Sequence, residues 1–542
     1  MNDLVEFEIK TKKLIDELKS VCANAGLGND GNEYKVITQV FLYKFLNDKF
    51  LYEIKKNKKF KNSSDIENDL SNLSKEEYEM LLLELNENTA RFKLNNLIKS
   101  LFEKQNESNF HKILDDNFFE LSKENNEIFS IITSSGQKVL IFEKISQYIT
   151  DNKDNFCKAI INKLINFSFE TLFDKGFDFF ATIFEYLIKD YNSDSGGKYA
   201  EYFTPHAVSK IMSSCLVDAE VNDVSCYDPS AGSGTLIINL ANKIGEEKCS
   251  IFSQDISQKS SQLLRLNLII NNLTHSLPNI IQGNTILNPF HNSDDKDNEK
   301  FDFIVSNPPF KTDFSGYRDD LLTKKNSKRF FAGVPTVPKK KKDKMPIYLM
   351  FIQHIIHSLS ANGKASIVVP TGFLSAKGNI EKKIKKEILE KKIISGVISM
   401  PGNIFARTNT NVSIIFLDKK KSNNKIFLID ASHLGTAMMD GDREKIVLSK
   451  SEEEKVISTY REKKIEHDFS VSVDFQKIIE RNYSLTVGQY FDIKIEHKKM
   501  SINEFNNKIQ ETEEVIDKIF KRTDKLKTEL KSQLKRLKKN DI

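Results

Sequence analysis

The spacing of apolar and polar residues changes twice along the chain. Over residues 1–170, apolar side chains recur three and four positions apart, as at Val36, Val40 and Phe41, and Pro and Gly are scarce, so we expect a helical N-terminal domain. Over residues 171–420, short β-branched runs alternate with helical segments, which predicts an α/β fold with a mostly parallel sheet and crossover helices. The strand-like runs are VSCYDPS, CSIFSQD, FDFIVSNPP, ASIVVPTG, IISGVISM and VSIIFLD.

The last part of the chain has a third pattern of apolar and polar residues. We expect residues 421–497 to form a small C-terminal extension and residues 498–542 a long coiled-coil-like helix, because apolar residues there follow one heptad register. The a and d positions are Ile502, Phe505, Ile509, Ile516, Ile519, Leu526, Leu530 and Leu537, with Thr512, Thr523 and Gln533 in the gaps. Such a helix needs a partner helix to cover its apolar seam. Its last turns are rich in Lys and Arg, which either keep the helix soluble or contact phosphates.

Two polar stretches interrupt the α/β region. One is an acidic loop at 291–300, and the other runs from Lys311 to Pro346 and contains the lysine run Lys339 to Lys342. A lysine run is typical of a solvated loop or of a loop that contacts phosphates, and the sequence leaves both open.

Composition narrows the class of protein. The chain has 542 residues, a formal net charge of +5 and five cysteines without a C-x-x-C pair. The length predicts several folding units, and so small a charge says little by itself about nucleic acid. The cysteine pattern favours neither disulfides nor zinc, and His354 and His357 have no acidic partner at metal-ligand spacing, so we expect no metal. With no apolar stretch of membrane-spanning length and no secretory signal, we expect a cytoplasmic protein without a membrane partner.

Three strand ends carry residues suited to a nucleoside ligand. The loop from Asp228 to Gly234 joins a predicted strand to a predicted helix, and its glycines let the backbone approach a ligand closely. It lacks the third glycine of a dinucleotide loop, and its acid suits a ligand with an amino group, although a plain turn is the alternative. The next strand ends at Asp255, from which a carboxylate can accept both ribose hydroxyls, and a third ends near Asn284, within reach of a nucleobase.

The fourth strand end is the most specific feature of the sequence. It runs directly into Asn307-Pro308-Pro309-Phe310. Two prolines cannot donate to a sheet, so the strand must stop there. The rigid loop that follows presents the Asn307 carboxamide oxygen and the Pro308 carbonyl as acceptors beside an aromatic ring. This arrangement suits an exocyclic amine whose two hydrogens need partners.

Together these motifs resemble the amino-methyltransferases, in which an Asn-Pro-Pro-aromatic motif follows F-T-P, an Asp/Gly loop and an acidic strand end. Three further stretches are similar to the modification (M) subunits of type I restriction-modification systems, which belong to the N6-adenine DNA methylases: Tyr348 to His354, Val368 to Gly372 and Met400 to Phe405. The helical N-terminal domain and the C-terminal helix also look like theirs. The resemblance covers most of the chain and implies a Rossmann-like methyltransferase core at residues 171–420 with S-adenosylmethionine as cofactor.

The resemblance also implies roles for individual residues. Asn307 and Pro308 bind the adenine N6 amine, Pro309 keeps the loop rigid, and Phe310 stacks on an adenine rotated out of the duplex. Phe405 is a second candidate for packing against that base, with a core position as the alternative. The cofactor segments contribute Glu201, Tyr202, Phe203, Thr204, Pro205, His206, Asp228, Pro229, Ala231, Gly232, Ser233, Gly234, Asp255 and Asn284. At Asn284 these subunits often carry Asp, so the contact to the cofactor's adenine lacks a charge here.

The implied reaction is methyl transfer to adenine N6 in duplex DNA, within a complex. The residues after Leu417 are too few for two DNA-reading domains beside the heptad helix, so we expect sequence readout from a separate specificity (S) subunit. A second M subunit and a restriction (R) subunit are further expected partners, since nothing here resembles a nucleotide-triphosphate loop. The alternatives are an N-methyltransferase acting on a protein glutamine or on RNA, and a non-catalytic DNA-binding scaffold of a defence complex.

Overall fold

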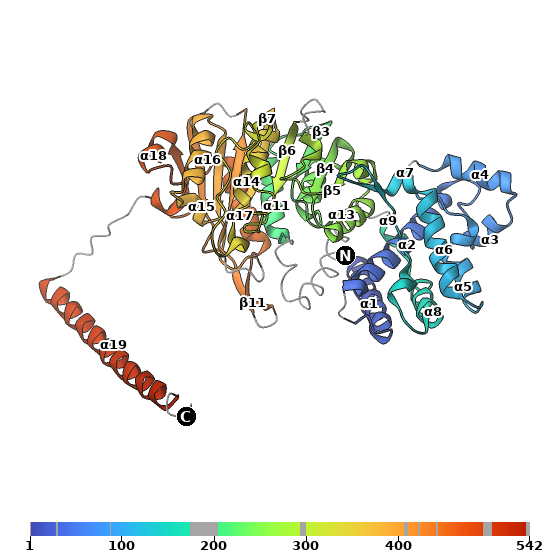
Figure 1. The fold of residues 1–542 in the computed structure, drawn as a ribbon, viewed down its shortest axis with the longest axis horizontal. Helices are drawn as coiled ribbons and strands as arrows, with labels where there is room; N and C mark the ends of the chain where they lie inside the picture. The colour runs from blue at the N-terminus through green and yellow to red at the C-terminus, as the bar shows by residue number, and fades with distance from the viewer. Residues whose placement is uncertain are drawn as a thin grey trace. The chain divides into compact units, whose positions relative to one another are not determined.

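The protein has two compact units, Met1–Phe491 and Asp492–Ile542. The computed structural model describes residues 2–28, 31–86, 88–173, 204–292, 300–405, 410–420, 423–440, 443–491 and 501–537. In the first unit a helical region is followed by a large sheet with helices packed on it (Figure 1). The second unit contains one long helix, α19 (Ile502–Leu537).

The N-terminal region is helical, as the apolar spacing predicts. Val36, Val40 and Phe41 are buried on α2 (Gly31–Lys56) and belong to the larger core cluster of the protein. The other helices are α1 (Asn2–Asn24), α3 (Ile66–Ser71), α4 (Lys75–Glu84), α5 (Ile98–Lys104), α6 (Phe110–Glu124), α7 (Asn126–Phe129), α8 (Lys153–Leu164) and α9 (Glu170–Phe173). Two short strands that the sequence analysis did not predict, β1 (Ile131–Thr133) and β2 (Lys138–Val139), interrupt this region.

The central sheet confirms the predicted α/β class. Within the described residues, eleven strands form one sheet in the order β13-β10-β8-β9-β7-β6-β3-β4-β5-β1-β2. Most neighbours are parallel, whereas β9, β13 and β2 run antiparallel to the strands beside them. The strands after β2 are β3 (Val224–Asp228), β4 (Cys249–Asp255), β5 (Ile280–Gln282), β6 (Phe301–Ser306), β7 (Leu359–Pro370), β8 (Ile394–Ser399), β9 (Val412–Asp418), β10 (Lys425–Asp430) and β13 (Ser470–Asp474).

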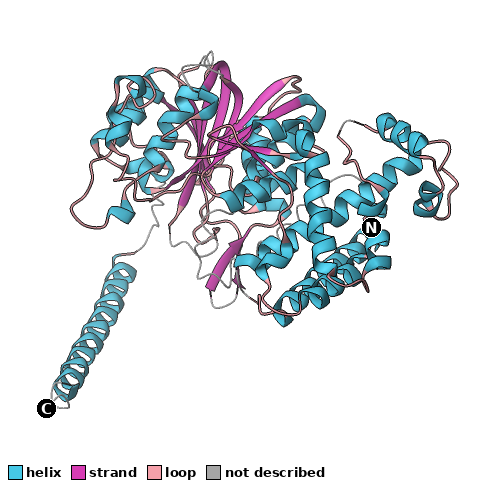
Figure 2. Ribbon diagram, turned by 45° about the vertical axis from the view of Figure 1, so that its right-hand side comes forward, coloured by secondary structure: helices cyan, strands magenta, loops and turns pink. Residues whose placement is uncertain are grey.

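Helices cover both faces of this sheet (Figure 2). Because side chains alternate along a strand, Ile367 and Val369 of β7 point into one core cluster and Val368 into the other. The helices of this part are α11 (His206–Leu216), α12 (Thr235–Ile244), α13 (Gln258–Ile270), α14 (Tyr348–Ser358), α15 (Gly372–Ser375), α16 (Asn379–Glu390), α17 (Lys450–Glu462) and α18 (Phe475–Glu480). The sheet is therefore the middle layer of three, which fits its apolar strands.

The N-terminal region is joined to the sheet through β1, which pairs with β5 in parallel. The Ser134 amide donates to the Gln282 carbonyl at 2.9 Å, and the approach is so close that a Cβ on Gly283 would lie 2.6 Å from the Cβ of Ser134. The buried Arg265 guanidinium on α13 donates to the carbonyls of Val139 and Leu140 at 2.9 and 3.0 Å. Helical region and sheet are thus one packed body.

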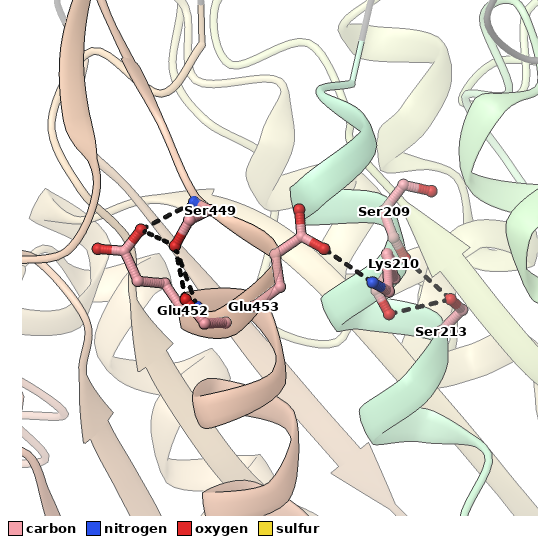
Figure 3. A network of polar contacts seen from close by, with 7 residues as sticks. Ser209, Lys210, Ser213, Ser449, Glu452 and Glu453 are labelled. Atoms are coloured by element: carbon pink, nitrogen blue, oxygen red, sulfur yellow. Dashed lines mark hydrogen bonds and ion pairs between the residues drawn. The ribbon is translucent and has the colours of Figure 1, made fainter. Parts of the chain in front are cut away.

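The described residues 423–440 and 443–491, from the segment expected as an extension, also take part in this body. β10 and β13 belong to the main sheet, and a hairpin of β11 (Thr436–Asp440) and β12 (Arg443–Val447) precedes α17. On α17, Glu453 pairs with Lys210 of α11 at 2.9 Å (Figure 3). The boundaries of the four segments expected from the sequence stay predictions.

The polar span from Lys311 to Pro346 is more ordered than its composition suggests. Phe314, Leu321 and Phe330 are buried there in a third apolar cluster, which includes residues of α14. The lysine run lies on an exposed loop with a single 3₁₀ turn, Lys342–Lys344. An exposed loop is compatible with both interpretations of these lysines.

Candidate functional site

The predicted site residues follow four strands that are neighbours in the sheet. The strand order β6-β3-β4-β5 places Asn307, Asp228, Asp255 and Gly283-Asn284 along one edge, because parallel strands end on the same side. Neighbouring strands are about 4.8 Å apart, so adjacent side chains of this row can contact the same ligand. The chain leaves β3 toward β4 on one side, and β6 lies on the other, which is the topological switch where α/β sheets bind ligands.

The loop after β3 is shaped by two glycines in left-handed backbone conformation, Gly232 at φ 54° and Gly234 at φ 89°. Gly234 caps α12, and a Cβ at this position would lie 2.3 Å from the Leu264 side chain of α13. Only glycine satisfies both the φ angle and the close packing. The loop is thereby held against α13, and its Gly232 amide donates to Asp255.

Asp255, at the end of β4, is buried and held by backbone groups. Its carboxylate accepts the Gly232 amide at 2.9 Å and the Ser257 amide at 2.8 Å. Burial raises the pKa of Asp255, and these two hydrogen bonds offset part of the shift. The carboxylate therefore connects the β3 loop to the start of α13.

Asp228, at the end of β3, is even less exposed. Its carboxylate accepts the Ser230 amide at 2.9 Å, and the Ser230 hydroxyl lies 2.7 Å from the Ser306 hydroxyl at the end of β6. Burial raises the pKa of Asp228 to about 8; the hydrogen bonds from Ser230 lower it, and the nearby Asp255 raises it further. None of these neighbours is a cation, so a cationic group entering the site would stabilise the carboxylate form.

Asn307 follows the last residue of β6, where the two prolines end the strand as expected. Its side-chain Nδ2 donates to Thr204 Oγ1 at 3.1 Å, across 103 residues of sequence. Thr204 is 5% exposed, whereas Asn307 is partly accessible. With Nδ2 engaged, the amide oxygen is the end of the side chain that is free to meet a ligand.

These residues line one pocket. Of the residues expected at the site, the pocket brings together Thr204, Asp228, Pro229, Ala231, Ser233, Asp255, Asn284, Asn307 and Pro309. The cofactor segments and the start of the Asn-Pro-Pro-Phe motif thus share one cavity. Its acidic side chains and Asn307 therefore face the same space.

Other expected residues among those that the structure describes do not line the pocket. Gly232 and Gly234 shape its loop, and Pro205 and His206 begin α11. Phe310 is half-buried, with its ring 6.4 Å from that of Tyr348 in an edge-on arrangement. Phe405 is buried in the larger core cluster. Glu201, Tyr202 and Phe203 lie outside the described residues, and Pro308 is buried.

The pocket has lining residues that the sequence analysis missed. Tyr317 and Thr312 come from the polar span, Ile347 and Phe351 from the start of α14, and Ile256 follows Asp255 and is 66% exposed. The Asn284 Oδ1 accepts the Ile286 and Leu287 amides at 3.0 and 3.1 Å. A large apolar residue directly after an acidic strand end was the available signal for Ile256.

His354 and His357 do not form a metal site with acidic side chains. His354 is buried, its Nε2 lies 3.1 Å from the Tyr227 hydroxyl, and burial lowers its pKa well below the ordinary value. In the part of the chain that the structure describes, no three His, Cys, Asp or Glu side chains gather as metal ligands. Among the same residues, no helix is both long and apolar enough to cross a membrane.

A family model and individual relatives both match this chain to DNA methylases. A model of the N-6 DNA Methylase family matches residues 175–499. The type I restriction enzyme MpnII methylase subunit of Mycoplasma pneumoniae is 28% identical over 436 residues, which cover 78% of this chain and 77% of that protein. The MjaIX methylase subunit of Methanocaldococcus jannaschii is 27% identical over 377 residues, or 66% of this chain and 63% of the relative.

Solved structures share the fold. The type I restriction-modification methyltransferase subunit from Streptococcus thermophilus matches with a TM-score of 0.72 at 21% identity and covers 90% of this chain and 100% of that one. A modification subunit of a putative type I restriction enzyme from Vibrio vulnificus matches with a TM-score of 0.53 at 16% identity, over 87% and 93% of the two chains.

Proposed function

The chain belongs to the N-6 DNA Methylase family, among the methylase subunits of type I restriction-modification systems, and takes S-adenosylmethionine as cofactor; from this premise we propose that it methylates adenine N6 in duplex DNA. The observation that carries the proposal is the shared pocket, in which Asp228 and Asp255 lie beside Asn307. The side with Asp228 and Asp255 offers acceptors for a nucleoside that carries an amino group. The side with Asn307 offers an acceptor for the amine of the second substrate.

The pocket residues fit the cofactor. Burial raises the pKa of Asp228 to about 8, and a cationic amino group is the partner that such a carboxylate lacks. Asp255 has acceptor capacity left for ribose hydroxyls after its two backbone hydrogen bonds, and Ile256 and Phe351 supply apolar surface for a base. When bound, S-adenosylmethionine supplies an activated methyl group on a sulfonium.

Asn307 and Pro308 act on the other reactant. We propose that the Asn307 oxygen and the Pro308 carbonyl accept the two hydrogens of the adenine amine. Its lone pair is delocalised into the ring, so two acceptors that draw the hydrogens out of plane make the nitrogen a better nucleophile. Phe310, held in the rigid Asn-Pro-Pro-Phe loop, stacks on the flipped base. Stacking of roughly 1–3 kcal/mol per base helps offset extrusion from the duplex.

The C-terminal helix supports a function within a complex. Apolar a and d side chains of α19 are exposed, among them Ile509, Ile516 and Ile519 at 42–57%. A seam of this kind pairs with another helix. We propose that it binds helices of a separate S subunit that reads the DNA sequence, with a second M subunit and an R subunit joining the assembly. Ile516→Asp with Ile519→Asp should abolish copurification with the S subunit, and Thr528→Asp, on the outer face of the register, should not.

The deciding experiment is sequencing of genomic DNA from a methylation-free host that expresses the chain with its S subunit, without it, or as Asn307→Ala. We expect N6-methyladenine at one bipartite motif, present only with the partner and absent in the variant. Soluble, cofactor-binding complex without methylated adenine would sink the proposal, and methyl incorporation into protein glutamine or RNA fractions would then identify the substrate class.

A further inference from the structure

The orientation of the Asn307 carboxamide decides whether it can serve the base. Its two ends are chemically opposite, since Oδ1 accepts hydrogen bonds and Nδ2 donates them. A substrate amine brings hydrogens, so only Oδ1 is a productive partner. If the group rotated by half a turn, Nδ2 would face the amine, donor against donor. Asn307 is partly accessible, so its burial alone does not exclude that rotation.

Thr204 is the residue that holds this carboxamide. Its Oγ1 accepts Asn307 Nδ2 at 3.1 Å, and it is buried while also lining the pocket. A hydroxyl can accept or donate, so the contact alone permits both orientations of the amide. The ambiguity ends when another acceptor in the pocket takes the hydroxyl hydrogen. Oγ1 then has only lone pairs to offer, and Nδ2 must face it.

The support behind Thr204 is rigid. The residue directly precedes the N-cap of α11, and α11 is bound on two sides. Ser209 donates to the Thr235 carbonyl of α12 at 3.1 Å, and Lys210 pairs with Glu453 of α17 at 2.9 Å (Figure 3). A hydroxyl on such a support keeps its place and can hold the Asn307 carboxamide in one orientation.

We propose that Thr204 is a positioning residue: with its own hydrogen taken by an acceptor on the bound cofactor, its hydroxyl fixes Asn307 with Oδ1 toward the substrate amine. Cofactor binding thereby prepares the amide for the base. This inference rests on the proposed function, because it concerns the amine that Asn307 receives. Thr204 then has two roles. It contacts the cofactor, as expected from the sequence, and it positions Asn307 for the adenine.

The test uses the complex of the full chain with its S subunit and compares Thr204→Val, which keeps the shape, with Thr204→Ser, which keeps the hydroxyl. We expect Thr204→Val to lower kcat about tenfold at saturating S-adenosylmethionine and DNA, the equivalent of one neutral hydrogen bond. Thr204→Ser should restore kcat to within about twofold. The matched control is Ser213→Ala on the same helix, whose hydroxyl bonds only the backbone of α11 at Ser209 and Lys210, and its kcat should stay at the wild-type level.

A second readout does not depend on turnover. In DNA with 2-aminopurine directly beside the target adenine, flipping of the adenine unstacks the probe. S-adenosylhomocysteine should therefore raise the fluorescence with the wild type and with Thr204→Ser, but not with Thr204→Val. An unchanged kcat at saturation, with only a weaker Kd for S-adenosylhomocysteine, would overturn the inference and leave Thr204 as a cofactor contact. Wild-type methylation, measured in the same assay, tests the proposed function separately.

Discussion

The two sides of the pocket are built in different ways. On the β3–β4 side, Asp228 and Asp255 are buried and held by backbone amides a few residues away or from the adjoining loop. On the β6 side, Asn307 is half-accessible and held by one side chain from a distant segment. The first side is fixed by its own local sequence, whereas the second depends on how the chain folds as a whole. The substrate side therefore depends on a long-range contact, from Thr204 to Asn307, of a kind that the cofactor side does not need.

Asn307→Ala should give the largest effect. Loss of one preorganised acceptor is expected to lower kcat at least about 100-fold, because the amine then meets no oxygen at that place. Kd for S-adenosylhomocysteine should change less than about twofold, since Asn307 serves the other reactant. Single-turnover methyl transfer and calorimetry measure the two quantities. Equal losses of kcat and of affinity for S-adenosylhomocysteine would mean that Asn307 serves both reactants and that the two sides of the pocket are not distinct.

Asp255→Ala should act on the opposite side. We expect Kd for S-adenosylhomocysteine to rise about 10- to 100-fold, in line with hydrogen bonds to a charged group of about 1.5–3 kcal/mol. The matched control is Asp302→Ala, because Asp302 also accepts a backbone amide, that of Ser225 at 3.0 Å, but at the opposite edge of the sheet. The control should lower the melting temperature without changing Kd. A similar rise of Kd in both variants would show a folding effect and not a cofactor contact.

Cofactor affinity should depend on pH through Asp228. Its pKa is raised to about 8, so the carboxyl is mostly neutral below that pH and must release a proton to face a cationic amino group. Affinity for S-adenosylhomocysteine is therefore expected to rise with pH from 5.5 to 7.5, by at most about tenfold per unit. Asp228→Asn should flatten the profile. For the free protein the sign is opposite, since the raised pKa makes Asp228 lower the folding stability as pH rises from about 4 to 8.

Asn284→Asp should have the smallest effect. The Asn284 oxygen is already occupied by the amides of Ile286 and Leu287, and a carboxylate accepts the same two bonds. We expect Kd for S-adenosylhomocysteine to stay within about threefold of the wild type. A large gain in affinity would instead show that the added charge reaches the cofactor. Titration of both proteins at one pH decides between these outcomes.

The features that could be predicted from the sequence are those that local patterns of residues determine. The strand runs, the Asp228 loop and the end of β6 at Asn307 are visible because apolar runs, glycines and prolines act on their own neighbours. The long helix α19 follows from its heptad spacing in the same way. These features fixed most of the sheet and the identity of the pocket residues at the strand ends.

Other features depend on partners far away in sequence. β1 has three residues and is a strand because β5 and β2 lie beside it, and no periodicity can develop over so short a run. Phe314, Leu321 and Phe330 are spaced irregularly on 3₁₀ turns and loops, so the core they form left no pattern. The bond from Asn307 to Thr204 likewise crosses 103 residues. Tertiary contacts, and not local preferences, decide such positions.

The guanidinium of Arg265 joins a helix of the pocket to the N-terminal region. From the middle of α13 it donates to the carbonyls of Val139 in β2 and of Leu140, and the same helix begins beside Asp255 through the Ser257 amide. A single helix therefore shares its hydrogen bonds between the N-terminal region and the pocket carboxylate. The cofactor side of the pocket thus has its foundation in the N-terminal region as well as in the sheet.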